Sequence, residues 1–330
     1  MAPFIHPTEL PYLGFLPNDG RRIPLLGFYD NDRGQFCAYS LQPGNRVLVL
    51  PDTLLREGTY ISKEAAQPEV DYRLLMTEEL IQHFSYEEIL KVYRAIEEDI
   101  INGLTTLHQY FVLLYFSNAN NDLSDHLMIK ILVEYAFGNH RAFYDLLNDL
   151  ICVIHKMFEK RAPNLSNKNS FEKFTTMEAS DLEGKYFFPQ PIVEFYKNRE
   201  DKFLKLRYVR NNIYHHGHSP DHSFKFDDGF AFRVDDRFAA KLGDLQIWPE
   251  NLLKPNRLGS VLAILECLVS DMLNAADQLA VTLPICFQTE IQQIAPGYQI
   301  FLRSSVGKHI KCLEEYRQKH WFDPAKILGL

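Results

Sequence analysis

Residues 259–283 read GSVLAILECLVSDMLNAADQLAVTL and form the longest apolar stretch of the chain. Apolar residues recur along it at intervals of three and four, which is the period of an α-helix with a buried face. Three carboxylates interrupt the stretch: Glu266, Asp271 and Asp277. Because such charges are costly inside a bilayer, the pattern predicts a packed helix from about Arg257 to Leu283, ended by Pro284, and no membrane span.

The chain before this stretch also has mostly helical periodicity. Apolar residues at helical spacing run from Asp71 to about Arg161 and again over 191–216. Within the first region, Asn118–Asn121 and Gly138-Asn139 are typical helix-stop signals. Residues 162–188 are polar, so they predict a long loop between the two helical regions.

Strand signals are found near the N-terminus and in one hairpin. Residues 1–70 are rich in proline and glycine and contain short extended segments, which predicts a β-containing region. Residues 222–234 read HSFKFDDGFAFRV, with alternating apolar residues around an Asp-Gly turn, which predicts a small β-hairpin. The expected fold class is mainly α, with a β-rich region over 1–70, a helical domain over 71–283 that carries the hairpin, and a mixed tail over 284–330.

Composition and charge exclude several classes of function. The chain has 330 residues, of which 46% are hydrophobic and 24% charged, as in a globular protein with a sizeable core. A net charge of −8 excludes a uniformly basic nucleic-acid coat, so any RNA site has to be a local patch. The five cysteines include no C-x-x-C pair, which excludes zinc ribbons and thioredoxin motifs. We expect a cytoplasmic protein with reduced thiols.

One constellation of residues carries chemistry, within residues 208–218, which read YVRNNIYHHGH. Its helix is expected to bury three apolar residues: Leu206, Val209 and Ile213. Asn211 and His215 then lie together because they are four residues apart, and the long side chain of Arg210 reaches the same place. Histidine exchanges protons near neutral pH, and arginine presents a fixed charge and a fork of donors to phosphate oxygens. With no acid pair, this set suits phosphodiester transfer in RNA, where the 2′-hydroxyl is the nucleophile and no metal is needed.

The segment Arg210-Asn211-Asn212-Ile213-Tyr214-His215 matches the pattern R-N-x-x-x-H, and in its helical setting it resembles the HEPN superfamily. The resemblance covers roughly residues 71–283. It implies a HEPN-like helical bundle and a metal-independent endoribonuclease without a cofactor, whose active site is shared by a homodimer. It also implies a role as a toxin or in antiviral defence, with an antitoxin or regulatory protein as a further partner.

The resemblance also implies roles for the motif residues. His215 would transfer protons, Arg210 would bind the scissile phosphate, and Asn211 would orient the site. Some toxins of this family carry a tyrosine two residues after the histidine, where this chain has Gly217. A nucleotidyltransferase antitoxin is therefore not supported by the motif.

Five neighbours of the motif are candidates for binding the RNA substrate: Lys205, Arg207, Tyr214, His216 and His218. Basic side chains would contact phosphates, and a tyrosine would stack on an unpaired base. The alternatives are a solvated helix face for the basic residues and packing in a core or an interface for the tyrosine.

Two other functions stay open. The first is a non-catalytic HEPN-type module that binds a nucleotide or a protein, with the motif serving structure. The second is a metal-dependent hydrolase that uses a cluster of potential ligands: His215, His216, His218, Asp221 and His222. Their spacing follows no known metal motif, so a solvated loop is the alternative. A second arginine–histidine pair, Arg303 and His309, lacks the asparagine and contains Gly307.

Overall fold

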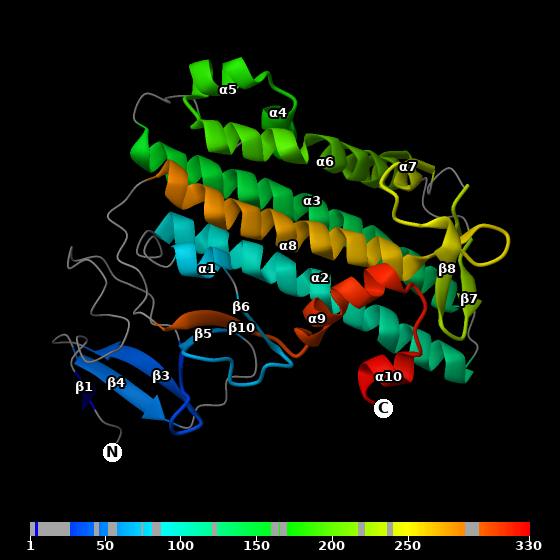
Figure 1. Cartoon of the computed structure of the whole chain (residues 1–330), viewed down its shortest axis with the longest axis horizontal. Helices are drawn as coiled ribbons and strands as arrows, with labels where there is room; N and C mark the ends of the chain where they lie inside the picture. Colours follow the sequence, from blue (N-terminus) through cyan, green and yellow to red (C-terminus); the bar gives the residue numbers. More distant parts are fainter. Residues whose placement is uncertain are drawn as a thin grey trace.

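The computed structural model describes residues 4–5, 27–42, 46–51, 58–73, 75–80, 87–120, 124–159, 165, 170–216, 222–235, 240–287 and 297–330. The protein is mainly helical, with a smaller β-sheet region near the N-terminus, as the sequence predicts (Figure 1). The bundle is built from five helices: α1 (Leu75–Leu80), α2 (Glu87–Asn120), α3 (Ser124–Phe158), α6 (Gln190–His216) and α8 (Val261–Cys286). In the bundle, α8 packs against the other four.

The long helices pack through stripes of apolar residues at helical spacing. In α2 the buried stripe consists of Ile89, Tyr93, Ile96, Ile100, Leu104, Leu107, Phe111 and Leu114. These residues repeat in steps of three and four, so they all lie on one face. Since α2 and α3 pack along much of their length, that face closes one side of the bundle core.

Helix α3 differs from its prediction, because it runs without a break through Gly138-Asn139. The side chain of Asn139 is buried and donates a hydrogen bond of 2.8 Å to the backbone carbonyl of Asp99 on α2. The asparagine therefore connects two helices and does not end one. The stop predicted at Asn118–Asn121 is confirmed, since α2 ends at Asn120.

Helix α8 is the central helix, as its apolar sequence predicts. The side chain of Ser260 caps its N-terminus by accepting a hydrogen bond from the backbone N–H of Leu262. The helix continues to Cys286, three residues beyond the predicted last residue, Leu283, because Pro284 lies in the last turn, where its ring removes a single helical hydrogen bond. Along the described ranges, none of the helices combines the length and the apolar character needed to cross a membrane.

The prediction of a loop over 162–188 is wrong for the second half of this segment. Two short helices form there, α4 (Phe171–Thr175) and α5 (Ala179–Tyr186). Phe171, Phe174 and Leu182 are fully buried, so a few apolar residues fix these helices in a segment of polar composition.

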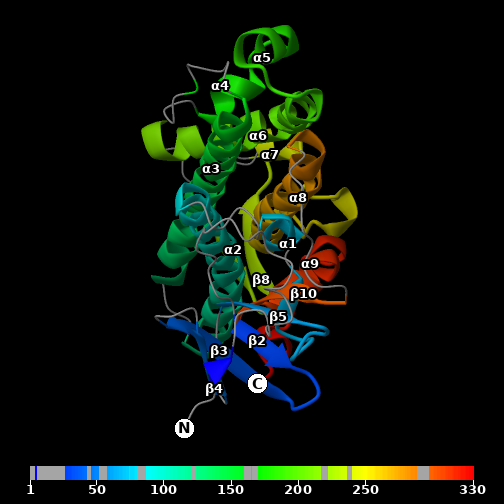
Figure 2. The same ribbon diagram turned by 90° about the vertical axis from the view of Figure 1, so that its left-hand side faces the viewer.

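A seven-stranded sheet lies on the α1 and α2 side of the bundle, away from α4, α5 and α6 (Figure 1, Figure 2). Its strand order is β1-β4-β3-β2-β5-β10-β6. The strands are β1 (Phe4–Ile5), β2 (Gly27–Asp30), β3 (Gln35–Gln42), β4 (Arg46–Pro51), β5 (Gly58–Ser62), β6 (Asp71–Arg73) and β10 (Gln299–Arg303). Strand β10 pairs antiparallel with both β5 and β6, so residues of the predicted tail and of the N-terminal region form one sheet.

The pair Arg303 and His309 is part of this architecture and does not form a second motif site. Arg303 is buried and donates two hydrogen bonds of 2.8 Å to the carboxylate of Asp71. Its guanidinium lies against the rings of Phe36 and Tyr60. His309 is fully buried on α9 (Lys308–Gln318).

The hairpin predicted over 222–234 is formed by β7 (Phe224–Phe226) and β8 (Gly229–Arg233). A third strand, β9 (Leu258–Ser260), pairs with β8 directly before α8 begins. Three further short elements lie in the C-terminal half: α7 (Ala240–Gly243), the 3₁₀ helix η4 (Glu250–Leu252) and α10 (Pro324–Leu328).

Candidate functional site

The motif residues occupy the last two turns of α6. The apolar face of this helix is buried as predicted, through Phe203, Leu206, Val209 and Ile213. Arg210 and Asn211 are half-buried at the edge of that face, whereas Tyr214 and His215 are exposed. Burial of one side of the helix therefore presents the motif to solvent on the other side.

The side chains of Arg210, Asn211 and His215 form one cluster. The Nη1 atom of Arg210 donates a hydrogen bond of 3.3 Å to Oδ1 of Asn211 and lies 3.5 Å from Nε2 of His215. A guanidinium has donors only, so this contact is a hydrogen bond when Nε2 of His215 carries no proton. The arrangement places a fixed positive charge directly beside an imidazole that can take up a proton.

Tyr214 contacts a neighbouring helix as well as the motif. Its ring lies 4.4 Å from the guanidinium carbon of Arg210, and its hydroxyl donates a hydrogen bond of 3.0 Å to the backbone carbonyl of Glu134 on α3. Both contacts are within the protein. The guanidinium of Arg210 therefore already occupies a face of the ring on which a substrate base would otherwise stack.

The basic candidates near the motif are paired with carboxylates. The Nζ atom of Lys205 lies 2.8 Å from Asp201, one turn earlier on the same helix. Arg207 forms an ion pair of 2.6 Å with Glu172 on α4. These pairs reduce the positive charge that the two residues present to a polyanion. His218 and the side chain of His216 lie outside the described residues.

The predicted metal cluster is described only in part. His215 and His222 are both exposed, while Asp221, His218 and the side chain of His216 lie outside the described residues. Within the ranges that the structure describes, no group of three or more His, Cys, Asp or Glu side chains could hold a metal ion.

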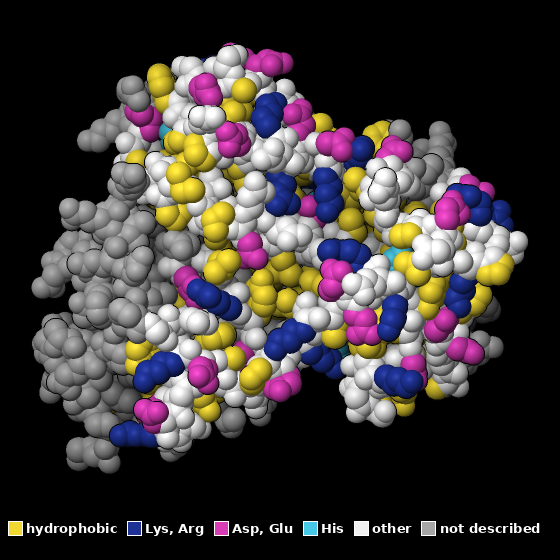
Figure 3. Space-filling view, viewed as in Figure 1, with side chains coloured by type: hydrophobic (Ala, Val, Ile, Leu, Met, Phe, Trp, Pro, Cys, Tyr) yellow, Lys and Arg dark blue, Asp and Glu magenta, His cyan; other side chains and the backbone are white. Residues whose placement is uncertain are grey.

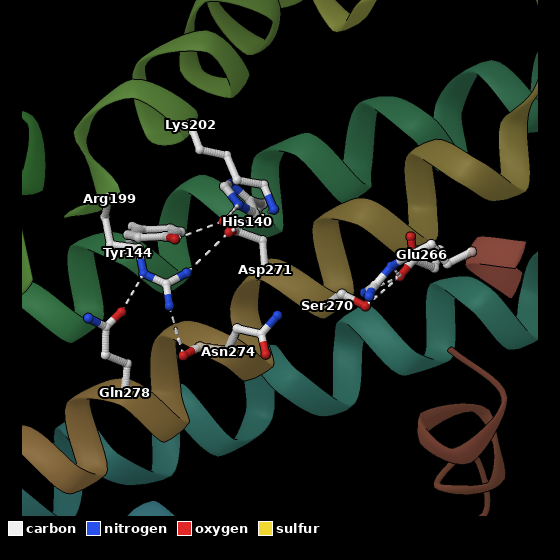
Figure 4. A network of polar contacts seen from close by, with 10 residues as sticks. His140, Tyr144, Arg199, Lys202, Glu266, Ser270, Asp271, Asn274 and Gln278 are labelled. Atoms are coloured by element: carbon white, nitrogen blue, oxygen red, sulfur yellow. Dashed lines mark hydrogen bonds and ion pairs between the residues drawn. The ribbon is translucent and has the colours of Figure 1, made fainter. Parts of the chain in front are cut away.

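A second polar cluster, which the sequence did not predict, lies inside the bundle around Asp271 (Figure 4). Four donors from two other helices surround this carboxylate. His140 Nε2 on α3 lies 2.9 Å away, and the hydroxyl of Tyr144 donates a hydrogen bond of 2.7 Å. From α6, Arg199 Nη1 and Lys202 Nζ lie at 3.3 Å and 3.0 Å. The Asp271 cluster thus joins α3, α6 and α8 at one point.

The surroundings keep Asp271 ionised in spite of its burial. Burial by itself raises the pKa of a carboxyl group, but the hydrogen bond and charge of His140, the charge of Lys202 and the hydrogen bond from Tyr144 lower it well below the usual range. Arg199 also donates to the side chain of Gln278 and to the carbonyl of Asn274, each at 2.9 Å. These donors satisfy the carboxylate, so the cluster holds three helices together.

One signal in the sequence points to such a cluster. A charged residue in the middle of an apolar helix is rarely buried without a partner. The partners themselves are distant in the sequence: Arg199 lies 72 residues and His140 lies 131 residues before Asp271. No local sequence pattern therefore connects them to Asp271. A similar case is Glu266, which is buried and accepts a hydrogen bond from Ser270 (Figure 4). Glu266 also accepts a hydrogen bond from Arg317.

The surface around α6 and α8 carries both signs of charge. In Figure 3, Lys and Arg side chains on this face are interspersed with Asp and Glu. The net charge of −8 agrees with this mixture. At the end of α6, the half-buried side chains of Arg210 and Asn211 meet the exposed side chain of His215 in one cluster. In comparisons with known proteins, no family model, no curated protein and no solved structure matches this chain.

Proposed function

We propose that this protein is a metal-independent endoribonuclease of the HEPN type, with Arg210, Asn211 and His215 in its active site. The observation that carries the proposal is the cluster at the end of α6, where Arg210 Nη1 lies 3.5 Å from His215 Nε2. Its histidine is exposed, and no carboxylate is among its members, so a phosphate group would be attracted to the cluster and not repelled.

The proposed reaction is an internal transesterification of RNA. The 2′-hydroxyl oxygen forms a bond to phosphorus while the bond from phosphorus to the 5′-oxygen breaks, which leaves a 2′,3′-cyclic phosphate and a 5′-hydroxyl. His215 would accept the proton of the 2′-hydroxyl, and Arg210 would stabilise the negative charge that develops on the phosphate oxygens. Asn211 would hold the guanidinium through the hydrogen bond that its Oδ1 accepts from Nη1.

A homodimer would complete this site. The reaction needs one group to remove a proton and another to deliver a proton to the leaving oxygen, and each motif supplies one histidine. Support for a second copy comes from α3, which contacts Tyr214 through Glu134 and carries four exposed apolar side chains: Leu127, Met128, Ile131 and Tyr135. Three of them border a groove of about 370 Å³ between α2 and α3. Exposed apolar patches of this kind are typical of protein–protein interfaces.

The test is cleavage of a mixed RNA pool in the presence of EDTA. Wild type would be compared with Arg210→Ala and His215→Ala, and with His222→Ala as the matched control, because His222 is exposed outside the helix. Each variant is first shown to have the wild-type helical content and oligomeric state. We expect wild type and His222→Ala to leave cyclic phosphate ends, and both motif variants to lose at least about a hundredfold in rate.

Two outcomes would contradict the proposal. Cleavage that EDTA abolishes, and that His222→Ala also removes, would favour the metal-dependent hydrolase. RNA binding by a folded dimer that cleaves no RNA would favour the non-catalytic module.

A further inference from the structure

We infer that Tyr214 is a positioning residue for Arg210, and that Gly138 on α3 is the position that allows it to act. Tyr214, Arg210, Glu134 and Gly138 are together called the Tyr214 clamp. The catalytic consequence of the clamp rests on the function proposed above, whereas its geometry does not.

The first part of the clamp is the stacking of Arg210 on Tyr214. The two residues are four apart on α6, so their side chains lie on the same side of the helix. The guanidinium carbon is 4.4 Å from the centre of the ring, within the range of a cation–π interaction. The ring is 48% exposed and lies outside the core, so its position depends on contacts other than core packing.

The second part is the anchor of the ring on α3. The Tyr214 hydroxyl donates a hydrogen bond of 3.0 Å to the backbone carbonyl of Glu134. A backbone carbonyl has two lone pairs, so it can accept this bond in addition to its own helical one. The anchor connects the exposed end of α6 to the first half of the 35-residue helix α3.

The third part is Gly138, which leaves room for the anchor. A Cβ atom added at this position would lie 2.8 Å from the Tyr214 hydroxyl oxygen, closer than real Cβ contacts. Glycine is a poor helix former, and Gly138 lies inside α3. The approach of Tyr214 gives a physical reason for glycine at this position.

Together these contacts restrict the arginine to one place. A free arginine samples many rotamers and loses that freedom when it binds a phosphate. With one side of its guanidinium on the ring and Nη1 on Asn211, Arg210 is already oriented beside His215. Tyr214 would therefore raise the rate of the chemical step without touching the substrate, a different role from the base stacking that the sequence suggests.

The central experiment uses Gly138→Ala. The added methyl group would displace the Tyr214 hydroxyl, while alanine is a better helix former than glycine, so α3 itself is not weakened. The matched control is Gly184→Ala in α5, where nothing lies within 4 Å of the added Cβ. Tyr214→Leu removes the ring, and Tyr214→Phe keeps the ring but loses the anchor.

Two readouts are compared for every variant. The first is the NMR signal of the Arg210 Nε–H group in protein labelled at arginine, assigned by its absence in Arg210→Lys. The ring current of Tyr214 should shift this signal in wild type and in Gly184→Ala, and the shift should be lost in Tyr214→Leu and reduced in Gly138→Ala. The second is RNA cleavage, where we expect kcat to fall about tenfold or more in Gly138→Ala and Tyr214→Leu, with KM changed less than about twofold. We expect Tyr214→Phe to lie between these variants and wild type.

The outcomes separate the clamp from the proposed function. An Arg210 signal that is unchanged in both Gly138→Ala and Tyr214→Leu would overturn the clamp. A raised KM with an unchanged kcat would also overturn it, in favour of Tyr214 as a substrate-binding residue. If wild type cleaves no RNA, the proposed function fails, and the NMR signal alone then decides whether Tyr214 positions Arg210.

Discussion

Asp271 is an ionised side chain in a core that consists mostly of aliphatic and aromatic residues. Its carboxylate is tolerated because donors from two neighbouring helices compensate for the lost hydration. Removal of the carboxylate would leave the half-buried guanidinium of Arg199 and the buried ring of His140 without their common partner. Breaking such a cluster is therefore expected to cost more than the cluster itself contributes.

We expect Asp271→Ala to lower the free energy of unfolding by about 3 to 5 kcal/mol. The control is Asp201→Ala, because Asp201 is 79% exposed and pairs with Lys205 on the surface, so its loss should cost less than about 1 kcal/mol. Urea denaturation followed by circular dichroism measures both values. Equal effects of the two substitutions would mean that the Asp271 cluster does not stabilise the bundle.

The surroundings of Asp99 on α2 raise the pKa of its carboxyl group, whereas those of Asp271 lower it. Burial and the nearby charge of Glu98 raise its pKa to about 6, and its Oδ2 atom is buried without a hydrogen-bond partner among the described residues. A carboxyl group whose pKa is raised by folding favours the folded state at low pH, and this contribution is lost as the pH rises from the unfolded pKa through about 6. Above pH 6, the ionised side chain therefore destabilises the protein.

We expect Asp99→Asn to raise the free energy of unfolding at pH 8 and to have little effect near pH 4. The amide has the same shape but never ionises, so the difference should develop as the pH rises through about 6. Urea denaturation at several pH values measures this difference, with Glu183→Gln as a control, because Glu183 is exposed on α5 and does not act on the pKa of Asp99. A constant difference across this range would contradict the assigned ionisation.

At the scale of elements, α9 is held on α2 by a pair of histidines. His309 Nε2 lies 3.3 Å from Nδ1 of His108, and its Nδ1 lies 2.9 Å from the hydroxyl of Tyr316. Burial, His108 and Lys308 lower the pKa of His309 to about 3. A histidine whose pKa is lowered by folding contributes stability above pH 6.5, and that stability is lost as the pH falls towards 3.

The contact between α9 and α2 is therefore predicted to weaken in acid. Between pH 6.5 and pH 3, we expect His309 to account for a loss of roughly 3 to 5 kcal/mol in the free energy of unfolding. His309→Gln should have a shallower pH dependence than wild type, whereas the exposed control His222→Gln should not. Identical pH dependence in wild type and His309→Gln would show that protonation of His309 plays no part.

The elements that the sequence predicted well are those whose signal is local. The apolar period of α8 lies within one helix, and the motif lies within six residues of α6, so spacing alone brings Arg210, Asn211 and His215 together. The continuity of α3 was missed because the reason for Gly138 is a tyrosine 76 residues further along the chain. The donors around Asp271 were missed for the same physical reason, since tertiary packing selects them.

At the scale of the whole molecule, the seven-stranded sheet depends on residues from both ends of the described chain. Strand β10 lies between β5 and β6 and pairs with both, and the buried pair of Arg303 and Asp71 joins it to β6. Without β10, both neighbours would lose a row of hydrogen bonds and present open edges.

We expect a chain truncated after Phe287 to aggregate or to lose cooperative unfolding. A chain that ends at Asp323 keeps β10 and α9 and is the matched control, with a modest loss from the absence of α10. Light scattering and thermal unfolding measure the two. If the chain that ends at Phe287 is soluble and unfolds cooperatively, the sheet does not need strand β10.

The position of β10 also sets a time scale for synthesis. Arg303 follows Asp71 by 232 residues, and a ribosome adds about 5 to 20 residues per second. Arg303 is therefore synthesised roughly 10 to 50 seconds after Asp71, the residue with which it pairs. During that interval the helices of the bundle emerge one after another, while β5 and β6 have no strand between them. The sheet is therefore the last layer of the nascent chain to close, and a ribosome that stalls before residue 303 would expose an edge on which a neighbouring chain could pair.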